Sequence, residues 1–288
     1  MEFSASDITV VLPAFNEADT IGDIIGRIRR ISPEFGVLVV DDGSSDRTAD
    51  AARVTGASVI VHEGNLGNGA SVKTGIRAAK TPVVVLMDAD GQHPPEAIPS
   101  LLEALREADL VIGCRSPDAQ SPFRHFGNAI LNKFARVMTG RRILDLTSGF
   151  RAARRDALLE YVHLFPSGFS YPTTSTIAFL KGGYRVKYLP VEGMGRRKKG
   201  VSKIRPFRDG LKFLTIIVRL AVLFEPVRVF VPPGLVLFLA GGAILIYQGI
   251  FWGRLEELPI LLVLSGLIIL FVGFLSDLVA SLTTKRKS

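Results

Sequence analysis

The chain has 288 residues, with 35 lysines and arginines against 27 aspartates and glutamates, and it contains one cysteine, Cys114. This length allows one domain of about 200 residues and an additional segment. A single cysteine excludes an internal disulfide and favours a reducing compartment. Residues 1–7 carry two acidic side chains and no long apolar stretch, so we expect no secretory signal there.

Residues 1–115 alternate between strand and helix patterns. We predict strands over 8–15, 36–42, 57–63, 82–88 and 108–114, and helices over 17–31, 45–55, 67–79 and 95–107. The first of these helices is amphipathic, with Ile21, Ile24, Ile25 and Ile28 on one face. Alternation of strand and helix predicts an α/β fold with a mainly parallel sheet and right-handed crossovers.

Polar clusters follow four of the predicted strands. They are Pro13–Glu17, Asp41–Asp46, Asp88–His93 and Gly113–Ser116. In a parallel sheet the ends of these strands converge on one edge, where open α/β sheets bind their ligands. Carboxylates suit ribose hydroxyls or base N–H groups, and glycines allow close approach of a ligand, so this composition suits a nucleoside diphosphate.

The third cluster contains two aspartates one residue apart. The strand over 82–88 is apolar until its last residue, and Pro94 and Pro95 prevent its continuation, so Asp88 and Asp90 lie on a tight loop. Crowded carboxylates repel each other, and oxygen ligands suit Mg²⁺ or Mn²⁺, which also bind phosphates. A solvated turn is the alternative for such a pair in isolation.

A glycine-rich segment, 64–72, leads into the third predicted helix. It contains Gly-Asn-Gly at 67–69, but Val72 stands where a dinucleotide-binding fingerprint requires glycine, and the segment follows the third strand rather than the first. Val72 before Lys73 also excludes a P-loop. We therefore interpret the segment as a loop that opens a helix near the same edge of the sheet.

The pattern is less regular over 122–195, where we predict a helix over 126–139 and a late strand over 184–191. Residues 196–219 contain nine lysines or arginines and one acid, a balance of +8 that equals the formal net charge of the chain. Over 205–219, basic and apolar side chains separate at helical spacing, which predicts an amphipathic helix in the lipid headgroup region. A coiled-coil or partner-binding helix is the alternative. Nucleic acid is the rival partner for the basic run, but the adjacent apolar segments favour a membrane.

Two runs, 229–247 and 258–276, contain no charged residue, and each is 19 residues long. A helix needs about 20 apolar residues to cross a bilayer, so we predict two transmembrane helices joined by a short link at 252–257. A buried hairpin of a soluble protein is the alternative. The basic segment before the first run and the basic tail at 283–288 predict that both ends face the cytoplasm.

Several motifs between Ile8 and Phe207 together make the chain similar to a known family. They are LPAFNE, VVDDGSSDRT, GNLGNGASVKTG, DADGQHPPE, GCR, LDLTSGFRAARR and RRKKGVSK. The chain resembles the family-2 glycosyltransferases of GT-A fold, and within them the polyprenyl-phosphate hexosyltransferases, such as dolichyl-phosphate mannose synthases and undecaprenyl-phosphate glucosyl- and aminoarabinosyltransferases. The domains that we expect are a GT-A domain over 1–204, a juxtamembrane amphipathic helix over 205–225, a transmembrane hairpin over 226–282 and a basic cytoplasmic tail over 283–288.

The resemblance also implies roles for individual residues. The nucleoside would be bound by Pro13, Ala14, Asn16, Glu17, Asp41, Asp42 and Gly43. Asp88 and Asp90, with Gln92 beside them, would hold Mg²⁺ or Mn²⁺ on the donor diphosphate. The acceptor phosphate would meet Arg115, Arg124, Asn128, Ser202 and Lys203, and the residues implied for catalysis are Asp88, Asp90, Gln92, Arg115 and Arg124. Members of the family often form oligomers, so we expect a homo-oligomer.

Together these features predict a membrane-anchored, metal-dependent, inverting transferase. It would move one hexose from UDP-glucose or GDP-mannose onto undecaprenyl or dolichyl phosphate at the cytoplasmic face. Residues 161–191 contain no Asp or Glu, and a phosphate acceptor, which is already anionic, needs no general base. The alternatives are a family-2 transferase that acts on another lipid hydroxyl, and a non-catalytic membrane protein that binds nucleotide sugars.

Overall fold

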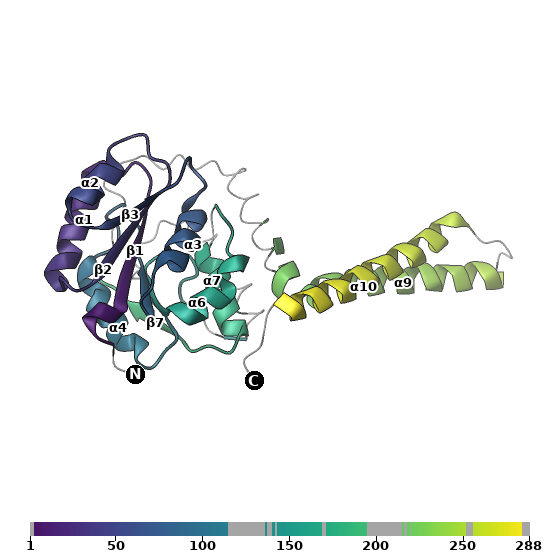
Figure 1. Ribbon diagram of the computed structural model, residues 1–288. Helices are drawn as coiled ribbons and strands as arrows, with labels where there is room; N and C mark the ends of the chain where they lie inside the picture. Colours follow the sequence, from purple (N-terminus) through teal and green to yellow (C-terminus); the bar gives the residue numbers. More distant parts are fainter. Residues whose placement is uncertain are drawn as a thin grey trace. The chain divides into compact units, whose positions relative to one another are not determined.

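The computed structural model describes residues 3–114, 136, 140–141, 143–168, 171–194, 215, 218–219, 221–251 and 256–283. The chain divides into two compact units, Met1–Asp209 and Gly210–Ser288. The first contains a sheet covered by helices, and the second contains a pair of long helices (Figure 1). Most of the predicted helices over 126–139 and 205–219 lies outside the described residues.

A seven-stranded sheet forms the centre of the first unit, in the order β3-β2-β1-β4-β6-β5-β7. The strands are β1 Ile8–Ala14, β2 Gly36–Asp41, β3 Ser58–Val61, β4 Val83–Leu86, β5 Leu110–Cys114, β6 Arg151–Arg154 and β7 Val186–Pro190. All paired strands are parallel except at β6, which is antiparallel to both β4 and β5. The predicted mainly parallel sheet is therefore confirmed, and a strand is present in each of the six predicted segments.

The strand that the sequence pattern does not predict is β6. Its sequence is Arg-Ala-Ala-Arg, which lacks the β-branched residues that fill β4. It forms a strand because it lies between two apolar strands, where Arg151 pairs with Leu86 of β4 and Ile112 of β5. Because β6 is antiparallel, it begins at the edge of the sheet where β4 and β5 end, and the residues before it reach that edge.

Helices cover both faces of the sheet, with α1, α2 and α4 on one side and α3, α6 and α7 on the other (Figure 1). Their bounds are α1 Ala18–Ile31, α2 Thr48–Val54, α3 Asn68–Ala78, α4 Ile98–Leu105, α6 Arg155–Tyr161 and α7 Tyr171–Lys181, with short 3₁₀ turns at η1 Ala5–Asp7, η2 Pro95–Ala97 and η4 Val162–Leu164. The four helices predicted before residue 108 are all present, with the helix predicted over 95–107 divided between η2 and α4.

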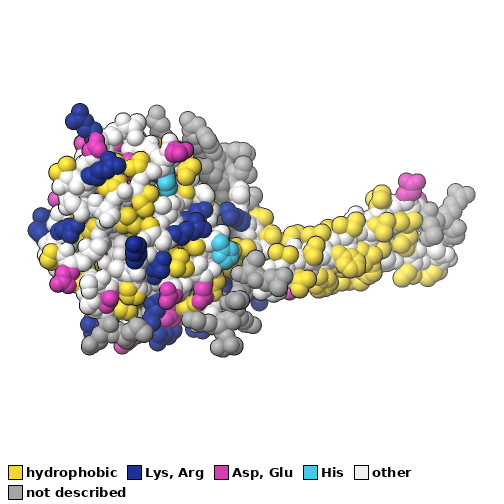
Figure 2. Space-filling view, in the orientation of Figure 1, with side chains coloured by type: hydrophobic (Ala, Val, Ile, Leu, Met, Phe, Trp, Pro, Cys, Tyr) yellow, Lys and Arg dark blue, Asp and Glu magenta, His cyan; other side chains and the backbone are white. Residues whose placement is uncertain are grey.

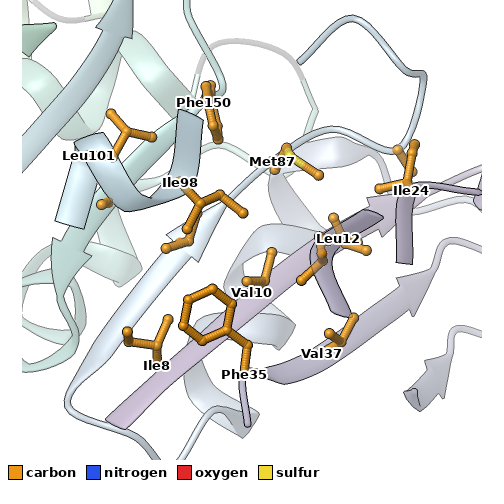
Figure 3. Close-up of a cluster of buried hydrophobic side chains, with 14 of the residues drawn as sticks. Ile8, Val10, Leu12, Ile24, Phe35, Val37, Met87, Ile98, Leu101 and Phe150 are labelled. Atoms are coloured by element: carbon orange, nitrogen blue, oxygen red, sulfur yellow. The ribbon is translucent and has the colours of Figure 1, made fainter. Parts of the chain in front are cut away.

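The main hydrophobic core lies between the sheet and the helices α1 and α4 (Figure 3). The four isoleucines that the amphipathic pattern of α1 predicts as one face are all buried. They pack with side chains from β1, β2 and α4, which include Val10, Val37 and Leu101. Burial of each such side chain contributes roughly 1.5–3 kcal/mol. This core fixes the positions at which β1, β2 and β4 end.

The second unit is a hairpin of α9 Pro226–Phe251 and α10 Glu257–Thr283. Both helices are long and apolar enough to cross a membrane, and hydrophobic side chains cover their surface (Figure 2). Glycines allow the helices to touch, because a Cβ at Gly241 would lie 2.8 Å from the Val263 backbone nitrogen. Near the turn, Gln248 Nε2 donates a hydrogen bond to Glu256 Oε2 at 3.3 Å. The two predicted spans thus correspond to two closely packed helices of membrane-spanning length.

Candidate active site

A cleft of about 350 Å³ opens where β1, β2 and β4 end and α3 begins. Its lining residues are Pro13, Ala14, Phe15, Glu17, Asp42, Asn65, Gly67, Asn68, Ser71, Asp88, Ala89 and Asp90. Six of them were expected from the sequence to bind the nucleoside or a metal, namely Pro13, Ala14, Glu17, Asp42, Asp88 and Asp90. The parallel strands therefore bring three of the four predicted polar clusters to one cleft.

Asp42, the residue directly after β2, connects the glycine-rich segment to the sheet. It is 3% exposed, and both of its carboxylate oxygens accept hydrogen bonds. Oδ1 accepts from the Leu66 N–H at 3.0 Å and lies 2.8 Å from His62 Nδ1, while Oδ2 accepts from the Gly67 N–H at 2.7 Å. His62 Nε2 lies 3.0 Å from Thr74 Oγ1. The sequence pattern marks His62 only as a polar residue at the end of the third strand, so its contact with Asp42 was not predicted.

Three residues expected to bind the nucleoside, Asn16, Asp41 and Gly43, lie beside the cleft but are not among its lining residues. Asn16 adopts a φ of 56°, and its Oδ1 accepts a hydrogen bond from the Ser45 N–H at 2.9 Å. Asp41 is buried, and its Oδ1 accepts from a backbone N–H three residues later. A Cβ at Gly43, whose φ is 71°, would lie 2.7 Å from the Gly64 backbone. These residues hold the loops around the cleft against each other.

Asp88 and Asp90 lie on the loop after β4. Asn68 Nδ2 donates a hydrogen bond to Asp88 Oδ1 at 3.4 Å. Gln92 donates to Asp90 twice, through its backbone N–H to Oδ1 at 3.0 Å and through Nε2 to Oδ2 at 2.5 Å. Gln92, which was expected beside a metal, is not among the lining residues of the cleft, and its amide orients Asp90.

The segment before β6 lies directly behind Asp88. A Cβ at Gly149 would lie 2.7 Å from Asp88 Oδ2, so a larger residue would displace the carboxylate. The Tyr171 hydroxyl donates a hydrogen bond to the Gly149 carbonyl oxygen at 3.3 Å. Burial, and after it the Asp88 carboxylate, raises the pKa of Tyr171, so the phenol stays protonated and remains a donor. This contact was not predicted because β6, which places Gly149 here, was not predicted.

Phe15 is an exposed aromatic residue that lines the cleft. Its side chain is 42% exposed although it directly follows the fully buried strand β1. Stacking of an aromatic ring on a nucleobase contributes roughly 1–3 kcal/mol, so an exposed ring beside hydrogen-bonding groups suits a nucleoside. Phe15 lies inside the predicted cluster Pro13–Glu17, but as the last apolar residue of the strand predicted over 8–15 it was not assigned a binding role.

The chemistry of the cleft suits a divalent cation that arrives with a phosphorylated ligand. Within the described part of the chain, no group of three or more His, Cys, Asp or Glu side chains is arranged to hold a metal by itself. Asp88 and Asp90 supply two carboxylates to one cleft. Mg²⁺ is commonly held by one or two carboxylates together with waters and substrate phosphates, and carboxylates suit Mn²⁺ as well.

The acceptor side of the predicted site falls outside the described residues, since Arg115, Arg124, Asn128, Ser202 and Lys203 all do so. One described arginine of the motif LDLTSGFRAARR, Arg151, is 1% exposed. It donates to the Ser148 carbonyl oxygen at 2.7 Å and to Ser175 Oγ at 2.8 Å. Burial lowers the pKa of Arg151 from its ordinary value. Its contacts indicate a structural cation that joins β6 to α7.

Comparison with known proteins identifies two families in the chain. Residues 9–162 match the family described as Glycosyl transferase family 2, and residues 225–282 match the family described as GtrB C-terminal hairpin. The chain is 32% identical over 216 residues to the undecaprenyl-phosphate mannosyltransferase of Micrococcus luteus, a match that covers 68% of this chain and 87% of that relative. It is 32% identical over 213 residues to the dolichyl-phosphate hexose transferase of Haloferax volcanii, covering 73% and 91%.

A solved structure supports the fold of the first unit. Glucosyl-3-phosphoglycerate synthase from Mycobacterium tuberculosis, in complex with Mn²⁺ and UDP-glucose, is similar with a TM-score of 0.58 and 23% identity, over 74% of this chain and 77% of that one. This similarity and the mostly parallel mixed sheet indicate a GT-A-like fold. The chain therefore belongs to glycosyl transferase family 2 and is a glycosyltransferase that carries a GtrB C-terminal hairpin.

Proposed function

We propose that the protein transfers a single hexose from a nucleotide sugar, UDP-glucose or GDP-mannose, to a polyprenyl monophosphate at the cytoplasmic membrane face. The transfer is metal-dependent and inverts the anomeric centre. The observation that carries this proposal is the single cleft that Phe15, Asp42 and the Asp88–Asp90 pair line together. The two relatives described above, whose names state polyprenyl-phosphate acceptors, and the two membrane-length helices support it.

The nucleoside of the donor binds at the part of the cleft formed by the end of β1 and by Asp42. Phe15 offers an exposed ring for the base. A carboxylate has about four lone-pair sites, and Asp42 uses three of them on His62, Leu66 and Gly67. It therefore keeps about one acceptor site for a ribose hydroxyl or a base N–H. In this proposal Asp42 both binds the nucleoside and keeps the glycine-rich segment beside it.

The diphosphate of the donor binds beside Asp88 and Asp90, which would hold the divalent cation. When bound, such a cation would neutralise the charge that develops on the departing nucleoside diphosphate. Gln92 keeps Asp90 oriented through two hydrogen bonds, and Asn68 contacts Asp88 from the start of α3. The carboxylates are thus held before the substrate arrives, which reduces the reorganisation needed during the reaction.

The acceptor is already a nucleophile. A lipid monophosphate carries negative charge at neutral pH, with a second pKa of ~6 by analogy with phosphorylated side chains. It needs cations to position it rather than a base, and residues 161–191 contain no Asp or Glu. We assign the positioning role to Arg115, Arg124, Asn128, Ser202 and Lys203, on the basis of the motifs in which they lie. A lipid hydroxyl as acceptor would require a general base in this region.

The experiment that tests the proposal is a donor and acceptor screen with the purified full-length protein. UDP-glucose and GDP-mannose are each incubated with undecaprenyl phosphate, dolichyl phosphate or the corresponding free polyprenols, and release of UDP or GDP is followed with and without EDTA. We expect release with one donor, only with the phosphorylated lipids, and none in EDTA. Equal activity with a free polyprenol would refute the phosphate acceptor, and NMR of the product anomer tests inversion.

The substitution Asp90→Asn tests most directly whether Asp90 binds the metal. The substitution keeps the size of the side chain but weakens an ionic oxygen ligand, so we expect turnover to fall by at least about 100-fold while the thermal unfolding temperature stays near that of wild type. Asp50→Asn on α2 is the matched control, because that carboxylate is 71% exposed and lies outside the cleft. Near-normal turnover of Asp90→Asn would remove the metal from the mechanism.

A further inference from the structure

The two aspartates of the loop after β4 are supported in different ways. The carboxylate of Asp90 is held by Gln92, as described above. The support of Asp88 comes through its backbone, because the Asp88 N–H donates a hydrogen bond to His93 Nδ1 at 3.2 Å. The same ring nitrogen lies 4.0 Å from Asp88 Oδ2. His93 therefore contacts the residue that begins the loop, while its own side chain is not among the lining residues of the cleft.

The ring of His93 has a fixed orientation. It is 2% exposed and stacks on Phe150, with 5.3 Å between ring centroids and 13° between ring planes. Phe150 is fully buried and belongs to the main hydrophobic core (Figure 3). Because Nδ1 accepts a hydrogen bond from a backbone N–H, the neutral ring carries its proton on Nε2. Burial and stacking hold Nδ1 towards the Asp88 amide.

The segment directly before β6 supports both the ring and the carboxylate. Phe150 lies under the His93 ring, and the preceding residue, Gly149, contacts the carboxylate, since a Cβ at that position would lie 2.7 Å from Asp88 Oδ2. The peptide of Asp88 and its carboxylate are thus fixed from two sides by consecutive residues of one segment. A shift of the His93 ring would therefore change the orientation of the Asp88 backbone after the end of β4.

We propose that His93 is a positioning residue for Asp88, acting as a fixed hydrogen-bond acceptor for its backbone amide. This inference rests on the proposed function, in which Asp88 holds a divalent cation on the donor diphosphate. His93 does not touch the donor, and its contribution is to the affinity of the cleft for the cation together with a nucleoside diphosphate. Groups that orient metal ligands commonly change metal affinity or activity by about 10–100-fold when they are removed.

Two substitutions separate the role of His93 Nδ1 as a hydrogen-bond acceptor from the packing of its ring on Phe150. His93→Phe keeps a planar ring that can stack on Phe150 but has no acceptor at the position of Nδ1. His93→Asn loses most of the stacked area but places its Oδ1 near the position of Nδ1, because both atoms are bonded to Cγ. We expect His93→Phe to require at least about tenfold more Mn²⁺ for half-saturation, and His93→Asn to stay closer to wild type. Thermal unfolding should show the reverse order, with His93→Asn the less stable variant.

The measurement is direct binding of Mn²⁺ to the full-length protein, in the presence of UDP and separately of GDP, followed by the electron paramagnetic resonance of free Mn²⁺. Unchanged Mn²⁺ binding by folded His93→Phe, or equal weakening in His93→Phe and His93→Asn, would overturn the proposal. If His93→Phe does not fold, His93→Gln replaces it, since its amide oxygen reaches the Nε2 side of the ring instead. Wild-type protein that binds no Mn²⁺ with either nucleotide would instead refute the proposed function on which the inference rests.

Discussion

Replacing Gly149 by alanine tests the position of the Asp88 carboxylate, because it adds a single methyl group next to it. A Cβ there would lie 2.7 Å from Asp88 Oδ2 and 3.2 Å from the Tyr171 hydroxyl oxygen. Gly149 has no left-handed backbone conformation, so alanine would act through these contacts alone. We expect Gly149→Ala to lower turnover by about 10–100-fold, because the carboxylate moves away from the diphosphate. Steady-state kinetics at saturating donor and metal measures the loss.

Gly22→Ala on α1 is the control for Gly149→Ala. A Cβ at Gly22 meets no atom within 4 Å, and the residue lies outside the cleft. Its turnover should match that of wild type. If Gly149→Ala also keeps full turnover, then either Asp88 is free to move without loss of activity or it does not take part in the reaction.

The sequence predicts single site residues where they follow a strand, and not where they contact one another across the fold. Asp88 and Asp90 could be found because a buried strand ends in two carboxylates. Gly149 could not, because its contact with Asp88 depends on the antiparallel strand β6, which carries no strand-like pattern of its own. His93 lies in the predicted cluster Asp88–His93, but residue type alone does not show that its ring contacts the Asp88 amide. Residue type shows which chemical groups are available, and tertiary contacts determine how those groups are oriented in the site.

At the scale of elements, the glycine-rich segment shows how a motif can serve packing. The Gly69 N–H donates to the Gly168 carbonyl oxygen at 3.1 Å, and the Ala70 N–H donates to the Ser167 carbonyl oxygen at 2.8 Å. A Cβ at Gly69 would lie 2.0 Å from the Pro166 carbonyl oxygen. Glycine here allows the backbone before α7 to cap the start of α3. The sequence could exclude a dinucleotide fingerprint, but it could not identify this internal partner.

An ion pair joins α1 to η2, the turn that follows the Asp88–Asp90 loop. Arg27 donates to Glu96 through Nε at 2.8 Å and Nη2 at 2.6 Å, and this contact lowers the pKa of Glu96 from its ordinary value of 4.5. The Glu96 side chain is 58% exposed, so solvent screens the pair and we expect Glu96→Gln to cost about 0.2–1 kcal/mol of unfolding free energy at pH 7.

The sign of the pH effect follows from the lowered pKa of Glu96. A carboxyl whose pKa is lower in the folded state stabilises the fold above its unfolded pKa, and this contribution disappears as the pH falls through the folded pKa. The difference in stability between wild type and Glu96→Gln should therefore be constant above about pH 4.5 and shrink below it. Thermal unfolding of both proteins between pH 7 and pH 4 measures it, and a difference that grows on acidification would contradict the assignment.

Adjacent glycines of α9 give a matched test of the hairpin. A Cβ at Gly241 would lie 2.8 Å from both the Pro259 carbonyl oxygen and the Val263 backbone nitrogen, whereas a Cβ at Gly242 meets nothing within 4 Å. Gly241→Ala should force the helices apart and cost about 1–3 kcal/mol, and Gly242→Ala should be neutral. Unfolding of the full-length protein in increasing SDS measures both. Equal behaviour of the two variants would refute close packing of α9 on α10.

At the scale of the whole molecule, composition and hydropathy predict which part of the chain forms the α/β domain and which part forms the apolar helices. Two uncharged runs gave two membrane-length helices, and strand–helix alternation gave the GT-A-like sheet. These features are predictable because they repeat over many residues, so that no single contact decides them. Together with the polyprenyl-phosphate transferases among its relatives, the two apolar helices indicate a membrane-associated protein.

The orientation of that protein in the membrane can be tested with introduced cysteines. The basic segment at 196–219 and the basic tail predict that both flanks of the hairpin face the cytoplasm and that the link at 252–257 faces away. We expect a membrane-impermeant maleimide to label Gly253→Cys in intact cells. Ser288→Cys should be labelled only after the cells are permeabilised.

The native thiol does not interfere with this measurement. Cys114 on β5 is 5% exposed, and burial raises the pKa of its thiol to about 12, so very little of the reactive thiolate is present at neutral pH. Wild-type protein is therefore the unlabelled control until it is denatured. Labelling of Ser288→Cys from outside, with Gly253→Cys protected, would reverse the orientation and place the transferase cleft on the wrong side for a cytoplasmic nucleotide sugar. Labelling of both variants from outside would mean that the hairpin does not cross the membrane. It would then not anchor the transferase at the membrane that holds the lipid acceptor.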